Sequence, residues 1–298
     1  MRTSVIIPNY NYGRYLPHAI DSVLNQTTPV DEIIVVDDGS TDSSKSILES
    51  YGDKITAIFQ PNAGQAAAFN VGVKKATGDI IFLLDADDLF HSDKIKTIKK
   101  LYADYPDIGW IFHELKHIND DALKKSFKDA GTLDDTEMEI IDKISMMKNG
   151  KLDYYAPATS GLSFRKIMID FIFPLPTAES IYISDHYIKF LALSSAKGIH
   201  IKNELGIQLI HEDNLYTGKT DHFKKARLFI NTAYHLKQKQ SSLGTFCDNL
   251  YADALLSYSK AGKPKELDTF IRQYGSAMSI LQKAKINLKF WIKKSRLA

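Results

Sequence analysis

The chain has 298 residues, of which 44% are apolar and 25% are charged, and its net charge is +2. These values are typical of a globular protein and exclude a strongly basic nucleic-acid-binding domain. The single cysteine, Cys247, excludes an intrachain disulfide and a multi-cysteine metal site. The first apolar run is too short for a signal peptide, and no uncharged stretch approaches ~20 apolar residues. We therefore expect a cytoplasmic protein without a transmembrane helix.

The first hundred residues alternate short apolar runs with segments of helical periodicity. The predicted strands lie at 5–7, ending at Pro8, and at 33–36, 55–59 and 80–84. The predicted helices lie at 16–24 and 65–76, and a further helix follows the turn at 37–40. Strands that alternate with helices imply right-handed crossovers and a mainly parallel sheet, so we expect an α/β fold.

The later residues show a different pattern. Strands are predicted at 108–118 and 158–164, and helices at 135–148 and 184–194. From residue 221 onward the pattern is helical with lysine-rich faces, interrupted at 262–264. The sequence therefore predicts a helical C-terminal part.

Three carboxylates crowd the end of the fourth predicted strand, in the run Asp85-Ala86-Asp87-Asp88. Like charges this close repel one another and resist burial. A divalent cation would neutralise them, because hard cations such as Mg²⁺ and Mn²⁺ prefer oxygen ligands. Ligands also bind outside the carboxyl ends of the strands in open α/β sheets. The alternative is a solvated acidic turn, and Asp88 is expected to cap a helix or to support its neighbours.

Three further loops are expected at the same edge of the sheet. Asp38 lies in an acidic turn and could accept hydrogen bonds from a nucleotide base or ribose; by itself the turn also fits a plain Asp-Gly turn with a helix cap, and its location beside the second acidic turn favours the ligand. Tyr10, in the loop from Pro8 to Gly13, could stack on a base, or the loop could be a plain turn without a ligand. Residues 62–65 open a helix, whose free N–H groups favour a phosphate.

Two polar sites follow in the second half. Asp185, at a predicted helix start, is either an N-cap or a base near the metal site. His211 could bind the metal or a phosphate, or could be structural or solvent-exposed. The segment from Lys283 to Arg296 carries six basic residues and no acid. Its apolar residues fall on two helix faces, which suits either a docked helix or peripheral contact with an anionic membrane.

Four motifs occur in order along the chain: Ser4–Asn11, Ile34–Asp42, Asn62–Gly78 and Leu84–Asp88. Together they resemble the family 2 glycosyltransferases with a GT-A fold, strongly to about residue 115 and more loosely to about 220. The resemblance implies a Rossmann-like, mainly parallel twisted sheet flanked by helices, with a C-terminal helical extension. It implies a nucleotide-sugar-binding subdomain at 1–110, an acceptor-binding subdomain at 111–220 and a helical extension at 221–298.

The resemblance also implies an activity and its residues. One sugar would move with inversion from a nucleotide-sugar, which we expect to be UDP-linked, to a hydroxyl of a glycan or lipid-linked acceptor in cell-surface polysaccharide biosynthesis. By position, Asp38 matches the base contact and Asp85 the ribose side of the DxD motif. Asp87 matches the carboxylate that binds Mn²⁺ or Mg²⁺, and Asp185 matches the general base. His211 is added to the metal site because of its imidazole, independently of the resemblance. The full donor site is assigned to Pro8, Tyr10, Asp38, Asn62, Gly64, Asp85 and Ala86.

Two positions depart from the family pattern. Phe69 stands where many relatives carry an arginine, and Ser184-Asp185 replaces the usual Glu-Asp pair. The alternatives are a nucleotidyltransferase acting on sugar phosphates or a non-catalytic nucleotide-sugar-binding module. The first would need a glycine-rich basic loop after the first strand, whereas residues 8–13 offer asparagines and tyrosines. We expect the enzyme to be cytoplasmic, and peripheral contact with the inner face of the membrane stays an open alternative.

Overall fold

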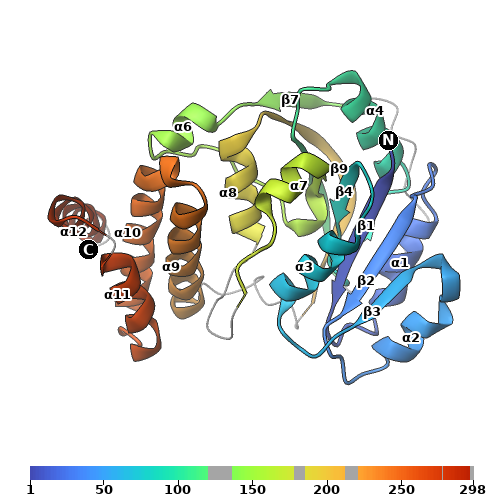
Figure 1. Ribbon diagram of the computed structural model, residues 1–298, viewed down its shortest axis with the longest axis horizontal. Helices are drawn as coiled ribbons and strands as arrows, with labels where there is room; N and C mark the ends of the chain where they lie inside the picture. Colours follow the sequence, from blue (N-terminus) through green and yellow to red (C-terminus); the bar gives the residue numbers. More distant parts are fainter. Residues whose placement is uncertain (120–135, 178–184, 212–220, 277, 296–298) are drawn as a thin grey trace. The chain divides into compact units, whose positions relative to one another are not determined.

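Figure 1 shows the computed structural model, which describes residues 1–119, 136–177, 185–211, 221–276 and 278–295. The chain forms two compact units. The first comprises residues 1–142, 155–179 and 196–217, and the second comprises residues 143–154, 180–195 and 218–298. The units divide the chain differently from the predicted boundaries at 110 and 220, because strands from both sides of residue 110 share one sheet.

The first unit is built on this sheet, whose N-terminal half is parallel. Its strands run in the order β3-β2-β1-β4, with β1 (Thr3–Asn9) in the centre. β2 (Glu32–Asp37) and β4 (Ile80–Leu83) flank β1, and β3 (Thr56–Phe59) pairs with β2. The carboxyl ends of these strands therefore meet at one edge, as the alternation of strands and helices predicts.

The other half of the sheet mixes strand directions. β8 (Leu162–Arg165) is antiparallel to both β4 and β6 (Trp110–Asn119). The long strand β9 (Gly198–Ile210) runs parallel to β6 and also pairs with β5 (Leu89–Phe90) and β7 (Met138–Ile141). The end of β9 thereby places residue 211 beside the acidic turn after β4.

Helices cover both faces of the sheet because successive strand residues point to opposite sides. Val5 and Ile7 face a core formed with α1 (Leu16–Leu24), α2 (Ser44–Ser50) and α4 (Lys94–Asp104). Ile6 points the other way and meets Gly72 of α3 (Gln65–Lys75), where a Cβ atom would lie only 2.4 Å from the isoleucine side chain. Helix α7 (Lys166–Ile172) follows β8, and short 3-10 turns lie at 52–54 and 159–161.

Three local predictions are wrong. β1 does not stop before Pro8 but continues to Asn9; Pro8 lies beyond the last pair with β4, so its missing N–H removes no ladder bond there. The predicted helix at 135–148 is strand β7 followed by the short α6 (Ile144–Lys148). Its isoleucines pair with β9, a partner that local periodicity does not reveal. The strand predicted at 158–164 begins only at Leu162, after a 3-10 turn.

The second unit is helical, as predicted for the C-terminal part. It contains α6, α8 (Asp185–Ser195), α9 (His222–Lys239), α10 (Gly244–Lys260), α11 (Asp268–Ser276) and α12 (Ile280–Ser295). Asp221 caps α9 by accepting hydrogen bonds from two backbone N–H groups, at 2.9 and 3.0 Å. Tyr251 of α10 stacks on Tyr274 of α11, with 4.1 Å between ring centroids. None of the helices described is long and apolar enough to cross a bilayer.

Candidate active site

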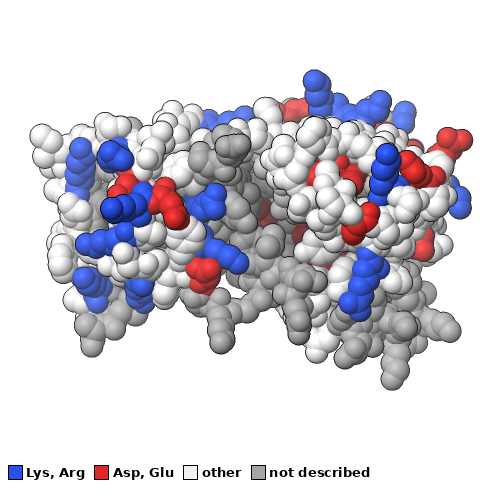
Figure 2. All heavy atoms as spheres, turned by 90° about the horizontal axis from the view of Figure 1, so that it is seen from below, with Lys and Arg blue, Asp and Glu red and all other residues white. Residues whose placement is uncertain are grey.

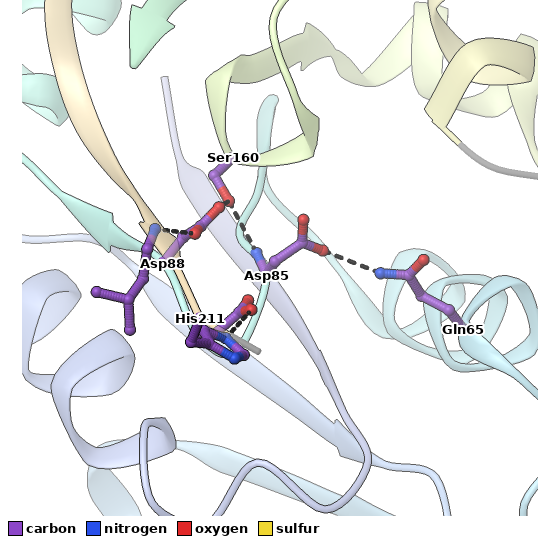
Figure 3. Close-up of polar contacts among 7 residues, drawn as sticks. Gln65, Asp85, Asp88, Ser160 and His211 are labelled. Atoms are coloured by element: carbon purple, nitrogen blue, oxygen red, sulfur yellow. Dashed lines mark hydrogen bonds and ion pairs between the residues drawn. The ribbon is translucent and has the colours of Figure 1, made fainter. Parts of the chain in front are cut away.

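The acidic turn after β4 lies at the carboxyl edge of the parallel strands and makes several contacts there (Figure 3). The backbone N–H of Asp85 donates to Ser160 Oγ at 3.0 Å. One carboxylate oxygen of Asp85 accepts from Gln65 Nε2, at the start of α3, at 2.9 Å. Asp85 is thus tied to two other segments and lies where the sequence predicts the donor site.

Asp87 and His211 lie together, as their shared assignment to a metal requires. The distance from Asp87 Oδ2 to His211 Nε2 is 3.0 Å, and both side chains are largely buried. Burial raises the pKa of Asp87 against the opposing effect of His211. The His211 ring stacks on Tyr15 with 4.6 Å between centroids, and Tyr12 meets its edge at 5.9 Å. The pair offers one oxygen and one nitrogen donor held by aromatic packing.

Asp88 is buried at the same edge of the sheet and is bonded to two other segments. Its Oδ2 accepts from Ser160 Oγ at 2.6 Å, and its Oδ1 accepts from the backbone N–H of Leu209 at 3.0 Å. Burial, together with the charges of Asp87 and Asp85, raises its pKa well above the usual range. Asp88 therefore connects the turn after β4 to the end of β9, two residues before His211. The expected supporting role fits this position better than a helix cap.

Lys94 is a fully buried lysine that contacts Ser160. Its ammonium donates to the carbonyl oxygen of Ser160 at 2.7 Å and lies 3.3 Å from the ring centroid of Phe90. Burial lowers its pKa well below the usual range, although the nearby Asp88 opposes this effect. Lys94 thus binds the backbone carbonyl of Ser160, while the Ser160 hydroxyl links the N–H of Asp85 to the carboxylate of Asp88.

Asp38 is buried and holds the loop that leads into α3. Its carboxylate accepts hydrogen bonds from Gln60 Nε2 at 2.6 Å and from the backbone N–H groups of Ala63 and Gly64 at 2.9 and 2.7 Å. Gly64 has a φ of +88°, a conformation that favours glycine. The sequence assigns a phosphate to the N–H groups at this helix start, but the structure shows Asp38 bound to two of them.

The loop after β1 is tied to the turn after β2. Asn11 has a φ of +59° and its Oδ1 accepts from the backbone N–H of Thr41 at 2.7 Å. The N–H of Asn11 itself donates to Ser40 Oγ at 2.9 Å. Pro8 pairs with Val36 in the sheet, whereas Tyr10 is 46% exposed. Tyr10 is therefore open to a ligand, while Tyr12 and Tyr15 pack on His211.

Asp185 belongs to the second unit, where it begins α8. Its carboxylate contacts Lys189 Nζ at 2.8 Å and His186 Nδ1 at 3.2 Å. Burial opposes ionisation, but Lys189 and His186 hold the pKa of Asp185 well below its usual range. Asp185 is consequently ionised at neutral pH, in the form that accepts a proton.

Sequence inspection missed Ser160, Lys94 and the two tyrosines that pack on His211. A signal exists for Lys94, since it lies four residues before Ile98 on the buried face of α4. Ser160 carries no local signal, because its partners at 85 and 88 are more than seventy residues away.

The comparisons with known proteins decide the family. The family model described as glycosyl transferase family 2 matches residues 4–167, which is more than half of the chain. The chain belongs to this family. An uncharacterized glycosyltransferase of Nostoc sp. is 35% identical over 72% of this chain, and the match covers 66% of that relative. The glycosyltransferase GlyA of Streptococcus pneumoniae is 37% identical over 35% of this chain, but only 15% of GlyA is covered.

Solved structures of other proteins share the fold of this family 2 chain. Staphylococcus aureus TarS, residues 1–349 with UDP-GlcNAc, matches with a TM-score of 0.61 over 91% of this chain and 84% of that one, at 17% identity. The mannosyltransferase PcManGT of Pyrobaculum calidifontis, with GDP-Man and Mn²⁺, matches with a TM-score of 0.54 over 99% and 86%, at 16% identity. The predicted GT-A fold of the family 2 chain is thereby confirmed.

Proposed function

We propose that the protein transfers a single sugar from a nucleotide-sugar to an acceptor hydroxyl with inversion, assisted by Mn²⁺ or Mg²⁺. The observation that carries this proposal is the buried pair of Asp87 and His211 at the carboxyl edge of β4. Membership of glycosyl transferase family 2 supports the reaction class. We infer a UDP-linked donor and a glycan or lipid-linked acceptor in cell-surface polysaccharide biosynthesis.

The residues at the edge of the sheet fit a divalent cation that is shared with a ligand. No group of three or more His, Cys, Asp or Glu side chains among the described residues could hold a metal by itself. Asp87 and His211 supply two donors, and the oxygens of a diphosphate can supply others. The combination of carboxylate and imidazole suits Mn²⁺ at least as well as Mg²⁺. When bound, such a cation would stabilise the charge that builds on the departing diphosphate.

The donor would lie along the loops that end β1, β2 and β4. We assign Asp38 to the nucleotide base, and Pro8 and Tyr10 to the loop that surrounds the nucleotide. Asp85 and Ala86 are assigned to the ribose side. Because Asp38 already accepts three hydrogen bonds from residues 60–64, it also fixes the position of Asn62 and Gly64.

Asp185 is proposed as the general base that removes the proton from the acceptor hydroxyl. Inverting transfer is an in-line displacement, so a carboxylate within hydrogen-bond reach of the hydroxyl suffices for this step. Lys189 keeps Asp185 ionised and, by the same pairing, lowers its basicity. We therefore expect the pH dependence of transfer to respond to substitution of Lys189.

A thermal-shift screen tests the proposal at the level of binding. UDP-, GDP- and dTDP-sugars are tested with and without Mn²⁺ on the full chain. A ligand at a hundredfold excess over its Kd stabilises a protein by about 2.7 kcal/mol, which such a screen detects. We expect one nucleotide series to stabilise the protein only with Mn²⁺. The effect should vanish in Asp87→Asn and persist in Asp104→Asn, a surface aspartate paired with Lys100.

Transfer then separates the enzyme from a binding module. Asp185→Asn should retain metal-dependent donor binding but lose transfer by two to four orders of magnitude, roughly the contribution of a general base. Asp268→Asn, at another helix start of the second unit, is the matched control and should remain active. Undiminished transfer by Asp185→Asn would overturn the base assignment. Formation of a nucleotide-sugar from a nucleoside triphosphate and a sugar phosphate would instead identify a nucleotidyltransferase.

A further inference from the structure

Helix α12 exposes a row of large apolar side chains to solvent. We call this row the outer strip; it consists of Ile280, Leu281, Leu288, Trp291 and Ile292, whose exposed fractions lie between 42% and 87%. The spacing of these residues places them on one side of a helix of 3.6 residues per turn. Surface hydrophobic residues are common singly, but a contiguous row on one face indicates an interaction site.

The opposite face of α12 attaches the helix to its own unit. Ile286 is buried, and Lys289 donates a hydrogen bond to Asn249 of α10. The helix is therefore docked by one apolar face, while a second apolar face remains exposed. The outer strip consequently contributes little to the packing that holds the second unit together.

Positive charge borders the outer strip. No Asp or Glu occurs from residue 280 to the end of the sequence, and Lys283, Lys285 and Lys294 of α12 are exposed. On a helical projection, Lys285 and Lys294 fall on opposite borders of the strip. Lys294 Nζ lies 5.1 Å from the ring centroid of Trp291. Figure 2 shows lysine and arginine side chains gathered over the helical unit, at the left of the view.

We propose that α12 lies flat on an anionic lipid surface, with the outer strip in the acyl boundary and the lysines at the headgroups. The combination of an apolar arc, a tryptophan and lysines on both borders is the pattern of an interfacial helix. The positive charge also argues against pairing of this strip with the same strip of a second copy, since lysines of both copies would border the contact and α12 carries no acidic residue to pair with them. Attraction to acidic lipids adds to the burial of the strip instead.

Co-sedimentation of the full chain with vesicles tests this proposal. One set of vesicles is phosphatidylcholine, and the other contains phosphatidylcholine and phosphatidylglycerol in equal parts. No nucleotide or metal is added, so the result is independent of the proposed function. We expect binding to the anionic vesicles only, and binding should weaken as salt screens the lysines. The double variant Lys285→Gln/Lys294→Gln should bind about 30-fold more weakly, since each lysine near such a surface contributes roughly fivefold.

A matched pair of variants isolates the apolar part of the contact. Leu288→Ser/Trp291→Ser should lower vesicle affinity at least about tenfold while leaving the thermal transition in place. Ile167→Ser/Tyr155→Ser makes the same kind of change at exposed apolar residues outside α12 and should bind as the unaltered protein does. Equal binding of anionic vesicles by Leu288→Ser/Trp291→Ser and by Ile167→Ser/Tyr155→Ser would overturn the proposal. So would absence of binding to anionic vesicles, or concentration-dependent self-association that Leu288→Ser/Trp291→Ser abolishes.

Discussion

Replacement of Ser160 by alanine should destabilise the sheet-containing unit more than its small change in volume suggests. The hydroxyl donates to the Asp88 carboxylate at 2.6 Å and accepts from the Asp85 N–H at 3.0 Å, and both bonds are lost in Ser160→Ala. A hydrogen bond to a charged group contributes about 1.5–3 kcal/mol and a neutral bond about 1 kcal/mol. We therefore expect a loss of about 3 kcal/mol, measured at a pH where Asp88 is ionised.

Chemical denaturation of the full chain measures the loss in the free energy of unfolding, and calorimetry on a separate sample measures the change in Tm. In a unit of this size each kcal/mol lowers the Tm by roughly 2–4 °C, so the expected shift is about 6–12 °C. Ser163→Ala is the matched control: Ser163 is equally buried in β8, but its hydroxyl donates to the carbonyl oxygen of Ile111 at 2.9 Å and has only a long contact, 3.5 Å, with the Tyr102 hydroxyl. It should cost only about 1 kcal/mol. Equal losses in the two variants would refute the idea that Ser160 holds the acidic turn.

Two further substitutions test other parts of the site. Asp38→Asn should destabilise the first unit by roughly 2–3 kcal/mol, because an amide nitrogen would face a backbone N–H of the 60–64 loop; unchanged unfolding in denaturant would contradict this. Lys189→Met should raise the pKa of Asp185, whose burial would then be less opposed. A base works only when ionised, so the acid limb of kcat against pH should move to higher pH in Lys189→Met. An unmoved limb in a variant whose Asp185 pKa is shown by NMR titration to have risen into the assayed range would count against Asp185 as the base. In the unaltered protein the depressed pKa favours folding above the unfolded-state value, and this contribution is lost as pH falls through the folded-state pKa.

The elements with strong local patterns could be predicted from the sequence. Ile33–Val36 and Ile80–Leu84 are apolar runs that end in acidic turns, and both contribute strands to the parallel half of the sheet. The proximity of Asp85 and Asp87 to the ends of neighbouring strands followed from the parallel topology. The likeness of four motifs to one family predicted the GT-A fold class.

Features that depend on distant partners could not be predicted. Residues 138–141 look helical by periodicity but form a strand because β9 lies beside them. The sequence predicts Asp38 as a turn residue that contacts a ligand, but its carboxylate accepts three hydrogen bonds from residues 60–64. Asp88 likewise gains its meaning from Ser160 and Leu209, which approach it only in the folded chain.

The most direct test of the account is the release of nucleoside diphosphate from nucleotide-sugars in the presence of Mn²⁺. Water can serve as a slow acceptor, so the natural acceptor is not needed. We predict that the unaltered chain releases nucleoside diphosphate from the sugars of one nucleotide. Chelation of the metal should stop this release, and Asp87→Asn should not show it. Release from no donor, or release that is unchanged by chelation and by Asp87→Asn, would contradict the assignment of a metal-dependent transfer site to Asp87 and His211.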